Sequence, residues 1–413
     1  MIEFTRHRLD NGLEIILYPD NSTPMVVLNL CYHVGAKHEN PNRTGFAHLF
    51  EHLMFGGSKN IADYDLPVHM AGGENNAFTT NDLTNYYISL PKANIETGFW
   101  LESDRMLALD FSQKSLDVQK KVVIEEFKQR NLNQPYGDVW ALLRELCYKV
   151  HPYQWATIGK EISHIEDATL AEVKDFFYRF YAPNNAVLVV GGNFEEEEVL
   201  RLAHKWFSPI PKRELGNKVL PQEPVQTEFR ELTVERKVPD SKIYLAFHMP
   251  ERSSKEYYIC DLISDVLSNG DSARLFQSLV KDKETFLEID AFVSGDHNAG
   301  LFVVTGKPNN GVSISDAVEA IWEELKRMKT TLVGETELDK VKNKLEANYV
   351  YSQMSYLNIA QELAIFEDIK EAELINSQMY LYRSITAEDL KAMASKLFAK
   401  TNCSQLNYLA KTC

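Results

Sequence analysis

Two imidazoles and a carboxylate lie within one expected helical turn in the segment His48-Leu49-Phe50-Glu51-His52. Residues four apart share a helix face, so His48 and His52 can bind one metal ion. Zinc accepts imidazole nitrogens, and a catalytic zinc needs three protein ligands and a water. Glu51 borders the same face and can take a proton from that water without being a ligand. The segment therefore predicts a site that activates water.

The flanking residues are typical of a short helix. Thr44 is the expected N-cap, because its hydroxyl can accept a hydrogen bond from a free N–H of the first turn. Gly56-Gly57 is a stop signal. The apolar positions between them are Phe46, Ala47, Leu49, Phe50, Leu53 and Met54. The alternative is that both histidines are ordinary core or surface residues that have this spacing by chance.

A third ligand is available in the expected helix over residues 115–130, which carries Glu125 and Glu126. Glu126 lies 74 residues after His52. Neighbouring residues point about 100° apart on a helix, so only one of the two glutamates can face the metal, and periodicity does not choose between them. The alternative is that both are solvated surface carboxylates, which is the usual place of glutamate.

The H-x-x-E-H order is the inverzincin signature. With the later glutamate segment, the sequence resembles the pitrilysin family, which includes insulin-degrading enzyme and the mitochondrial processing peptidases. In that family the third ligand closes a segment like Val122-Val123-Ile124-x-Glu, which favours Glu126. The resemblance implies a zinc endopeptidase with one Zn²⁺ per chain, held by His48, His52 and Glu126. It implies that Glu51 deprotonates the zinc-bound water, that the resulting hydroxide attacks the scissile carbonyl, and that Glu51 returns the proton to the leaving amine.

One position departs from the family pattern. Family members often carry a second glutamate two helical turns before the ligand, where this chain has Gln119. An amide can hydrogen-bond a metal ligand and orient it, but it adds no negative charge. We therefore expect weaker zinc binding than in relatives.

The segment from Gly72 to Ile88 begins with turn residues and continues as a strand rich in Thr, Tyr and Ile. It resembles the family's Asn-Ala-aromatic-Thr segment, an edge strand that pairs with the substrate backbone by β-augmentation. The resemblance assigns Asn76, Ala77 and Phe78 to substrate binding. An ordinary hairpin with a polar loop is the alternative.

Length and composition fit a soluble globular protein of two domains. The 413 residues suit two domains of about 200 residues each, and 44% hydrophobic with 25% charged residues is ordinary for globular chains. No apolar run approaches the roughly 18 residues of a membrane span. The net charge of −15 argues against nucleic acid, whose phosphates need a basic surface.

The compartment is predicted from the N-terminus and the cysteines. Residues 1–20 lack the pattern of a secretory signal, and Leu9 to Leu13 contains an Asn-Gly hairpin turn. The five cysteines are scattered and odd in number, which disfavours a disulfide framework. We expect a cytoplasmic protein; removal of a signal peptide would instead indicate the periplasm.

The family resemblance implies an α+β fold of two homologous α/β sandwich domains, each a mixed or antiparallel sheet covered by helices, forming half of a clamshell. The first, zinc-binding domain spans residues 1–208, a Pro-rich linker 209–228, and a degenerate copy 229–413. The copy is indicated by a strand at 242–248 followed by a helix at 256–266. Helices of the first domain are expected at 95–109, 115–130, 138–148 and 170–181.

The second half departs further from the family. There, an arginine and a tyrosine seven residues apart stabilise the oxyanion, whereas this chain has Val280 and Leu287. The resemblance to two-subunit bacterial members then implies that a homologous subunit without zinc supplies the pair in a heterodimer; a weakly active chain or a homodimer is the alternative. A non-enzymatic scaffold subunit and an unrelated α/β protein with a chance motif are further hypotheses. The sequence does not identify the substrate.

Overall fold

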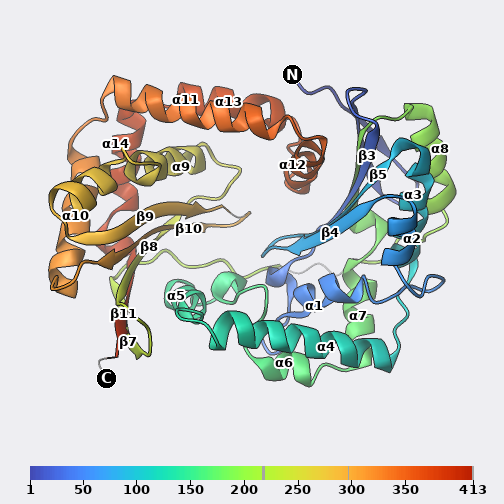
Figure 1. Cartoon of the computed structure of the whole chain (residues 1–413), viewed down its shortest axis with the longest axis horizontal. Helices are drawn as coiled ribbons and strands as arrows, with labels where there is room; N and C mark the ends of the chain where they lie inside the picture. The colour runs from blue at the N-terminus through green and yellow to red at the C-terminus, as the bar shows by residue number, and fades with distance from the viewer. Residues whose placement is uncertain (216–218, 296, 412–413) are drawn as a thin grey trace. The chain divides into compact units, whose positions relative to one another are not determined.

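The computed structural model describes residues 1–215, 219–295 and 297–411. They form two compact units, each built on one sheet with helices packed against it (Figure 1). The first unit comprises Met1–Gln129, Trp155–Leu220 and Val350–Asn376. The second comprises Arg130–Gln154, Pro221–Tyr349 and Ser377–Cys413. The prediction of two α/β sandwiches is confirmed, while residues 216–218 of the predicted linker lie outside the described residues.

The first unit has a six-stranded sheet in the order β1-β2-β6-β3-β5-β4, with β4 at one edge. Only β2 and β6 pair in parallel. The strands are β1 Thr5–Arg8, β2 Glu14–Pro19, β3 Met25–Tyr32, β4 Glu74–Thr79, β5 Thr84–Pro91 and β6 Ala186–Gly192. The helices are α1 Phe46–Leu53, α2 Asp65–Met70, α3 Ile95–Leu107, α4 Gln113–Phe127, α6 Ile162–Glu166, α7 Leu170–Phe180, α8 Glu196–Phe207 and α12 Tyr356–Asp368. The helices expected at 95–109, 115–130 and 170–181 are therefore present, with no end shifted by more than three residues.

The second unit has a five-stranded sheet in the order β7-β11-β8-β10-β9. Only β7 and β11 pair in parallel. The strands are β7 Arg230–Arg236, β8 Lys242–Met249, β9 Phe286–Ser294, β10 Gly300–Pro308 and β11 Cys403–Ala410. The helices are α5 Val139–Cys147, α9 Lys255–Ser268, α10 Ile314–Thr330, most of α11 Glu335–Ser352, α13 Leu374–Ser384 and α14 Ala387–Leu397.

The two sheets repeat one pairing pattern. Read from β2 and from β7, each sheet has one parallel pair followed by three antiparallel pairs, so β3 with the helix α1 corresponds to β8 with α9. This repeat is the duplication that the sequence indicated only by one strand and one helix in its second half.

Two helices belong to the unit opposite to their place in the sequence. The helix α12 packs on β3 and β6 of the first sheet through Ile359, Ala360 and Leu363. The helix α5 packs on β8 and β11 of the second sheet through Val139 and Leu143. The predicted division into 1–208 and 229–413 does not include this exchange, because contacts between distant segments leave no signal in local composition. Among the described residues, no helix combines the length and apolar composition needed to cross a bilayer.

The start of α1 differs from the expectation. Thr44 is not the N-cap: Gly45 takes that place with φ 90°, a left-handed conformation that glycine adopts easily. The buried carboxylate of Glu39 accepts hydrogen bonds from the Gly45 and Ala47 N–H groups, at 2.9 and 2.8 Å. It also accepts one from the Trp155 indole at 3.1 Å. The prediction was wrong because the cap comes from outside the helix segment, while the Thr44 hydroxyl bonds His164.

The buried Glu39 carboxylate therefore makes a testable contribution to stability. Glu39→Ala leaves the Gly45 and Ala47 N–H groups buried without their acceptor, while the Trp155 indole keeps its bond to the Ala36 carbonyl. The variant should lower the free energy of unfolding by about 1–3 kcal/mol. The measurement is a urea titration with an unchanged m-value. The exposed Glu166→Ala is the control and should stay within about 0.5 kcal/mol of wild type. Equal midpoints for the two variants would contradict this role of Glu39.

Candidate metal centre

The helices α1 and α4 bring three ligand atoms to one point. His48 and His52 lie one turn apart on α1, and Glu126 lies in the last turn of α4. Glu126 Oε2 is 3.5 Å from His48 Nε2 and 3.3 Å from His52 Nε2. One ligand atom from each residue lies within 4.8 Å of the others, and no further group of this kind was found among the described residues.

The spacing of these atoms fits a small divalent metal ion. In a tetrahedral zinc site with bonds of about 2.0 Å, neighbouring ligand atoms are about 3.3 Å apart. The two distances from Glu126 Oε2 agree with this value. Two imidazole nitrogens and one carboxylate oxygen are also a ligand set that leaves a fourth position open.

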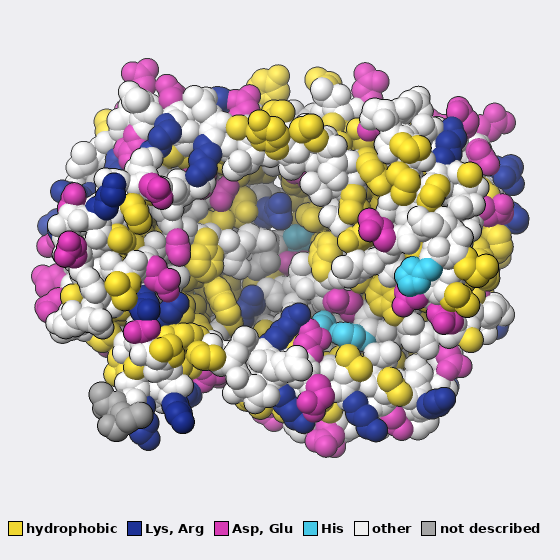
Figure 2. Space-filling view, in the orientation of Figure 1, with side chains coloured by type: hydrophobic (Ala, Val, Ile, Leu, Met, Phe, Trp, Pro, Cys, Tyr) yellow, Lys and Arg dark blue, Asp and Glu magenta, His cyan; other side chains and the backbone are white. Residues whose placement is uncertain are grey.

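The site is buried on one side and accessible on the other. The His48 side chain is 8% exposed, whereas His52 is 27% and Glu126 19% exposed. Figure 2 shows histidine side chains beside acidic ones over the region where Figure 1 places α1 and α4. A ligand can therefore approach from solvent while the core holds the rear of the site.

The two adjacent glutamates of α4 have different surroundings. Glu126 faces the histidines, while Glu125 is 62% exposed and pairs with Lys128. Two turns earlier on α4, the Gln119 amide lies close to Gly56, which follows α1. A Cβ at Gly56 would lie 2.9 Å from Ser115 Oγ, so glycine permits the close approach of α4 to this end of α1.

Glu51 projects toward the edge strand β4. Thr79, the last residue of β4, donates a hydrogen bond from its hydroxyl to Glu51 Oε2 at 2.6 Å. Sequence reasoning did not assign a role to Thr79. The available signal was its place as the threonine of the Asn-Ala-aromatic-Thr segment, directly after Asn76-Ala77-Phe78.

Buried polar side chains support α1 from behind. The Tyr86 hydroxyl donates to the Phe50 carbonyl of α1 at 3.3 Å. The Arg105 guanidinium forms a buried ion pair with Glu102 and lies over the rings of Tyr64 and Tyr86. Burial raises the pKa of the Tyr64 and Tyr86 hydroxyls well above the usual range, so both remain neutral donors.

The residues predicted to bind substrate lie on β4. Ala77 and Thr79 face the side of the sheet where α1 packs, and Phe78 packs on the opposite side with the cluster under α12. The Ala77 N–H is not used in the β4–β5 ladder and bonds Asn76 Oδ1 at 2.8 Å. This edge of β4 therefore carries a backbone donor directed away from the sheet.

The two positions expected to lack oxyanion donors lie in the second unit. Val280 is partly buried against the hydrophobic core of that unit. Leu287 lies on β9 with 47% of its surface exposed. Neither side chain can donate a hydrogen bond.

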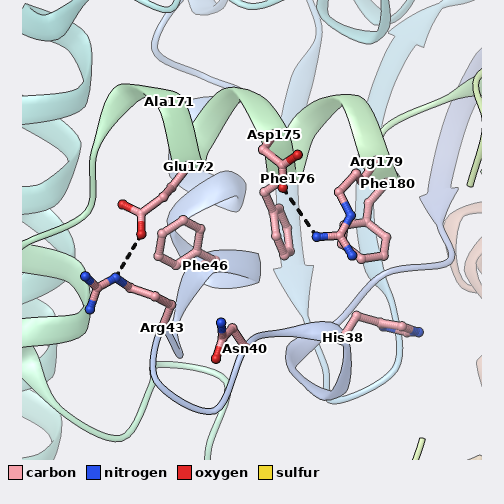
Figure 3. Close-up of a pocket in the computed structure, with 10 residues that line it drawn as sticks. All are labelled: His38, Asn40, Arg43, Phe46, Ala171, Glu172, Asp175, Phe176, Arg179 and Phe180. Carbon is pink, nitrogen blue, oxygen red and sulfur yellow. Dashed lines mark hydrogen bonds and ion pairs between the residues drawn. The ribbon is translucent and has the colours of Figure 1, made fainter. Parts of the chain in front are cut away.

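A separate pocket of about 330 Å³ lies between α7 and the segment 38–46 (Figure 3). Phe46 of α1, Phe176 and Phe180 provide its apolar surface, and the ion pairs Arg43–Glu172 and Arg179–Asp175 border it. None of the three metal-ligand candidates lines this pocket.

The structure thus has two repeated sheet-and-helix units, one of which carries a histidine pair and a glutamate with metal-site spacing. Two family models match the chain. One, described as insulinase (peptidase family M16), matches residues 15–159, and the other, described as the peptidase M16 inactive domain, matches residues 167–345. The chain belongs to peptidase family M16.

Similar proteins are named as proteases. The zinc protease PqqE of Helicobacter pylori is 28% identical, covering 95% of this chain and 90% of that protein. The mitochondrial-processing peptidase subunit beta of Saccharomyces cerevisiae is 24% identical over 88% of this chain and 80% of its own. A protease structure from Helicobacter pylori aligns with a TM-score of 0.92 at 25% identity, covering 99% of this chain and all of that one.

The chain corresponds to one half of some larger relatives. It aligns with 48% of the periplasmic protease PqqL of Escherichia coli at a TM-score of 0.80 and 21% identity, with 99% of this chain covered. It aligns with 45% of pitrilysin at a TM-score of 0.79 and 17% identity, again with 99% covered. These two likenesses concern the fold.

The different places of Glu125 and Glu126 yield a matched pair of variants. Glu126→Gln removes a ligand and should weaken binding of Zn²⁺ by more than the about 10–100-fold that loss of a supporting group costs. Glu125→Gln should bind Zn²⁺ as wild type does, because its carboxylate pairs with Lys128. Competition with a chromophoric chelator measures both. Equal zinc affinities for the two variants would contradict the assigned ligand set.

Proposed function

We propose that this chain is the metal-bearing subunit of a zinc endopeptidase that cleaves peptides or small unfolded polypeptides. The observation that supports this most directly is the convergence of His48, His52 and Glu126 at tetrahedral spacing beside the carboxylate of Glu51. The names of the relatives support zinc as the metal and proteolysis as the reaction class. One zinc per chain would be held by the three side chains.

The mechanism follows from where these side chains lie. When bound, zinc lowers the pKa of a coordinated water towards 7 and polarises a carbonyl as a Lewis acid. Glu51 is the general base: it takes a proton from the attacking water and later delivers it to the leaving amine nitrogen. Thr79 holds one Glu51 oxygen. His48 and Glu126 are mostly buried, which limits their rotamers during the reaction.

The edge strand β4 is the proposed binding site for substrate backbone. An added strand would form main-chain hydrogen bonds to β4, and its alternate side chains would meet the two faces of the sheet. The Ala77 N–H is a hydrogen-bond donor on this edge, and the Asn76 side-chain oxygen accepts it in this structure. Phe78 packs under α12. Substrate binding must therefore displace the Asn76 side chain from the Ala77 N–H.

We further propose that a homologous subunit completes the active centre. Val280 and Leu287 stand where the family resemblance calls for oxyanion donors, and each such donor is worth about 2.7–4 kcal/mol in comparable sites. The chain aligns with about half of PqqL and of pitrilysin, so each of those polypeptides has a further half outside the aligned part. Here a separate non-zinc subunit, or a second copy, would take that place.

A non-enzymatic scaffold role is the second candidate. The observation in its favour is that residues 167–345 match a family described as the peptidase M16 inactive domain. A scaffold has no need of the metal site, however, and the first unit holds all three ligand candidates at metal-site spacing. We therefore favour the peptidase.

Peptide cleavage tests the proposal. The zinc-loaded chain alone should cleave an unstructured peptide library slowly, and addition of the homologous subunit should raise kcat by about 10²-fold or more, as expected for one restored oxyanion donor. Glu51→Gln should abolish cleavage in both samples while zinc content stays at one per chain. Full activity of the isolated chain would contradict the partner, and an active Glu51→Gln variant would contradict the assigned base.

Substitution of Ala77 tests strand addition. Ala77→Pro removes the outward N–H, and proline is tolerated on an edge strand where the N–H faces away from the ladder. Loss of one hydrogen bond of about 0.5–1.5 kcal/mol should raise KM about two- to ten-fold with little change in kcat. Ala77→Ser keeps the N–H and is the control. An unchanged KM for Ala77→Pro in a folded, zinc-loaded protein would exclude this donor from substrate binding.

A further inference from the structure

Thr79 contacts the proposed general base, Glu51, and lies on β4, the strand that we propose pairs with the substrate backbone. Its hydroxyl donates a hydrogen bond to Glu51 Oε2 at 2.6 Å. Thr79 is the last residue of β4, and Glu51 lies in the last turn of α1. This bond therefore joins the catalytic helix to the edge strand.

The backbone of Thr79 faces the same edge as that of Ala77. In an antiparallel pair, residues that exchange backbone bonds alternate with residues whose N–H and C=O point away. The Thr80 N–H bonds the Leu83 carbonyl across the turn, and Thr79 stands opposite Thr84 in the register. The alternation then directs the Thr79 backbone outward, in agreement with the Ala77 N–H, which bonds the Asn76 side chain and not β5.

We propose that Thr79 is a positioning residue that sets the orientation of the Glu51 carboxylate and links it to occupancy of the β4 edge. The inference rests on the proposed function and deepens it. A substrate strand that pairs with β4 fixes the backbone of Thr79, and the Thr79 hydroxyl then fixes Glu51 Oε2. In this proposal the other carboxylate oxygen, Glu51 Oε1, takes the proton of the attacking water.

Orientation of the Glu51 carboxylate requires the hydroxyl of Thr79 and not the volume of its side chain. A carboxylate accepts hydrogen bonds at both oxygens, and a donor on one oxygen selects a single orientation of the group. Valine has the shape of threonine but no donor, whereas serine keeps the donor and loses only a methyl group. Thr79→Val and Thr79→Ser therefore separate positioning from packing.

Thr84 provides a matched control within the same hairpin. It faces Thr79 across β4 and β5, and its hydroxyl donates to the Val34 carbonyl at 2.8 Å and not to Glu51. Thr84→Val removes a hydroxyl from the hairpin without touching the base. It should lower the free energy of unfolding by about 1 kcal/mol and leave kcat unchanged.

The experiment uses two measurements on the zinc-loaded full chain. The first is kcat and KM for peptide cleavage in the presence of the homologous subunit. The second is the affinity of acetohydroxamic acid, which binds zinc as its anion and transfers its N–O–H proton to a neighbouring base. The second measurement requires the metal and an oriented Glu51 but no peptide cleavage and no partner. Zinc content is determined for every variant.

We expect Thr79→Val to lower kcat about 10-fold, a part of the about 10²–10⁴-fold that general base catalysis contributes, with KM within about two-fold of wild type. Hydroxamate affinity should fall by a similar factor, and zinc content should not change. Thr79→Ser should recover both quantities. In a Glu51→Gln background, Thr79→Val should have no additional effect on hydroxamate affinity, because Thr79 acts only through Glu51.

Three outcomes decide between the claims. Wild-type kcat and hydroxamate affinity in Thr79→Val, or an equal loss in Thr84→Val, overturn the role of Thr79 and leave the proposed function intact. If hydroxamate binding depends on Thr79 but the chain cleaves no peptide, the positioning role of Thr79 is supported and the proposed peptidase function is contradicted. A zinc-loaded wild type that does not bind hydroxamate overturns both.

Discussion

Two helices that lie far apart in the sequence must hold three ligand atoms about 3.3 Å from one another, and the rest of the first unit is arranged around this constraint. A shift of α4 by one helical turn, about 5.4 Å, would remove Glu126 from the site. Leu116 and Val123 of α4 prevent such a shift because they are buried in the same core as Leu49 and Leu53 of α1. The metal site is therefore a product of core packing as much as of the motif.

The same packing aligns the base with the sheet edge. The helix α1 lies against β4, and the bond from Thr79 to Glu51 spans the contact. On the other face of the sheet, α12 packs on β3 and β6. A sequence segment from the second half thus stabilises the sheet that presents the proposed substrate edge. The first unit cannot be reproduced by the first 208 residues alone, because that piece lacks α12.

The sequence carried the features that depend on local spacing. The pair His48 and His52 follows from helical periodicity. The two-domain fold was implied by the family resemblance, and the strand and helix patterns of the second half supported it only weakly. The features that depend on contacts between distant segments could not be predicted from the sequence. Glu39 caps α1 from outside the helix, Thr79 meets Glu51 across two elements, and α5 and α12 exchange units. Helical phase alone also left Glu125 and Glu126 equivalent; the family pattern favoured Glu126, and the surroundings of the two side chains agree with that choice.

The central claim is that His48, His52 and Glu126 bind one zinc ion and leave one position open. X-ray absorption at the zinc edge on the stoichiometrically loaded full chain tests it most directly. We predict a four-coordinate zinc with about two imidazole nitrogens and two oxygens at about 2.0–2.1 Å, one oxygen being lost in Glu126→Gln and none in Glu125→Gln. A spectrum with sulfur ligands, with one imidazole or with no change in Glu126→Gln would contradict the account.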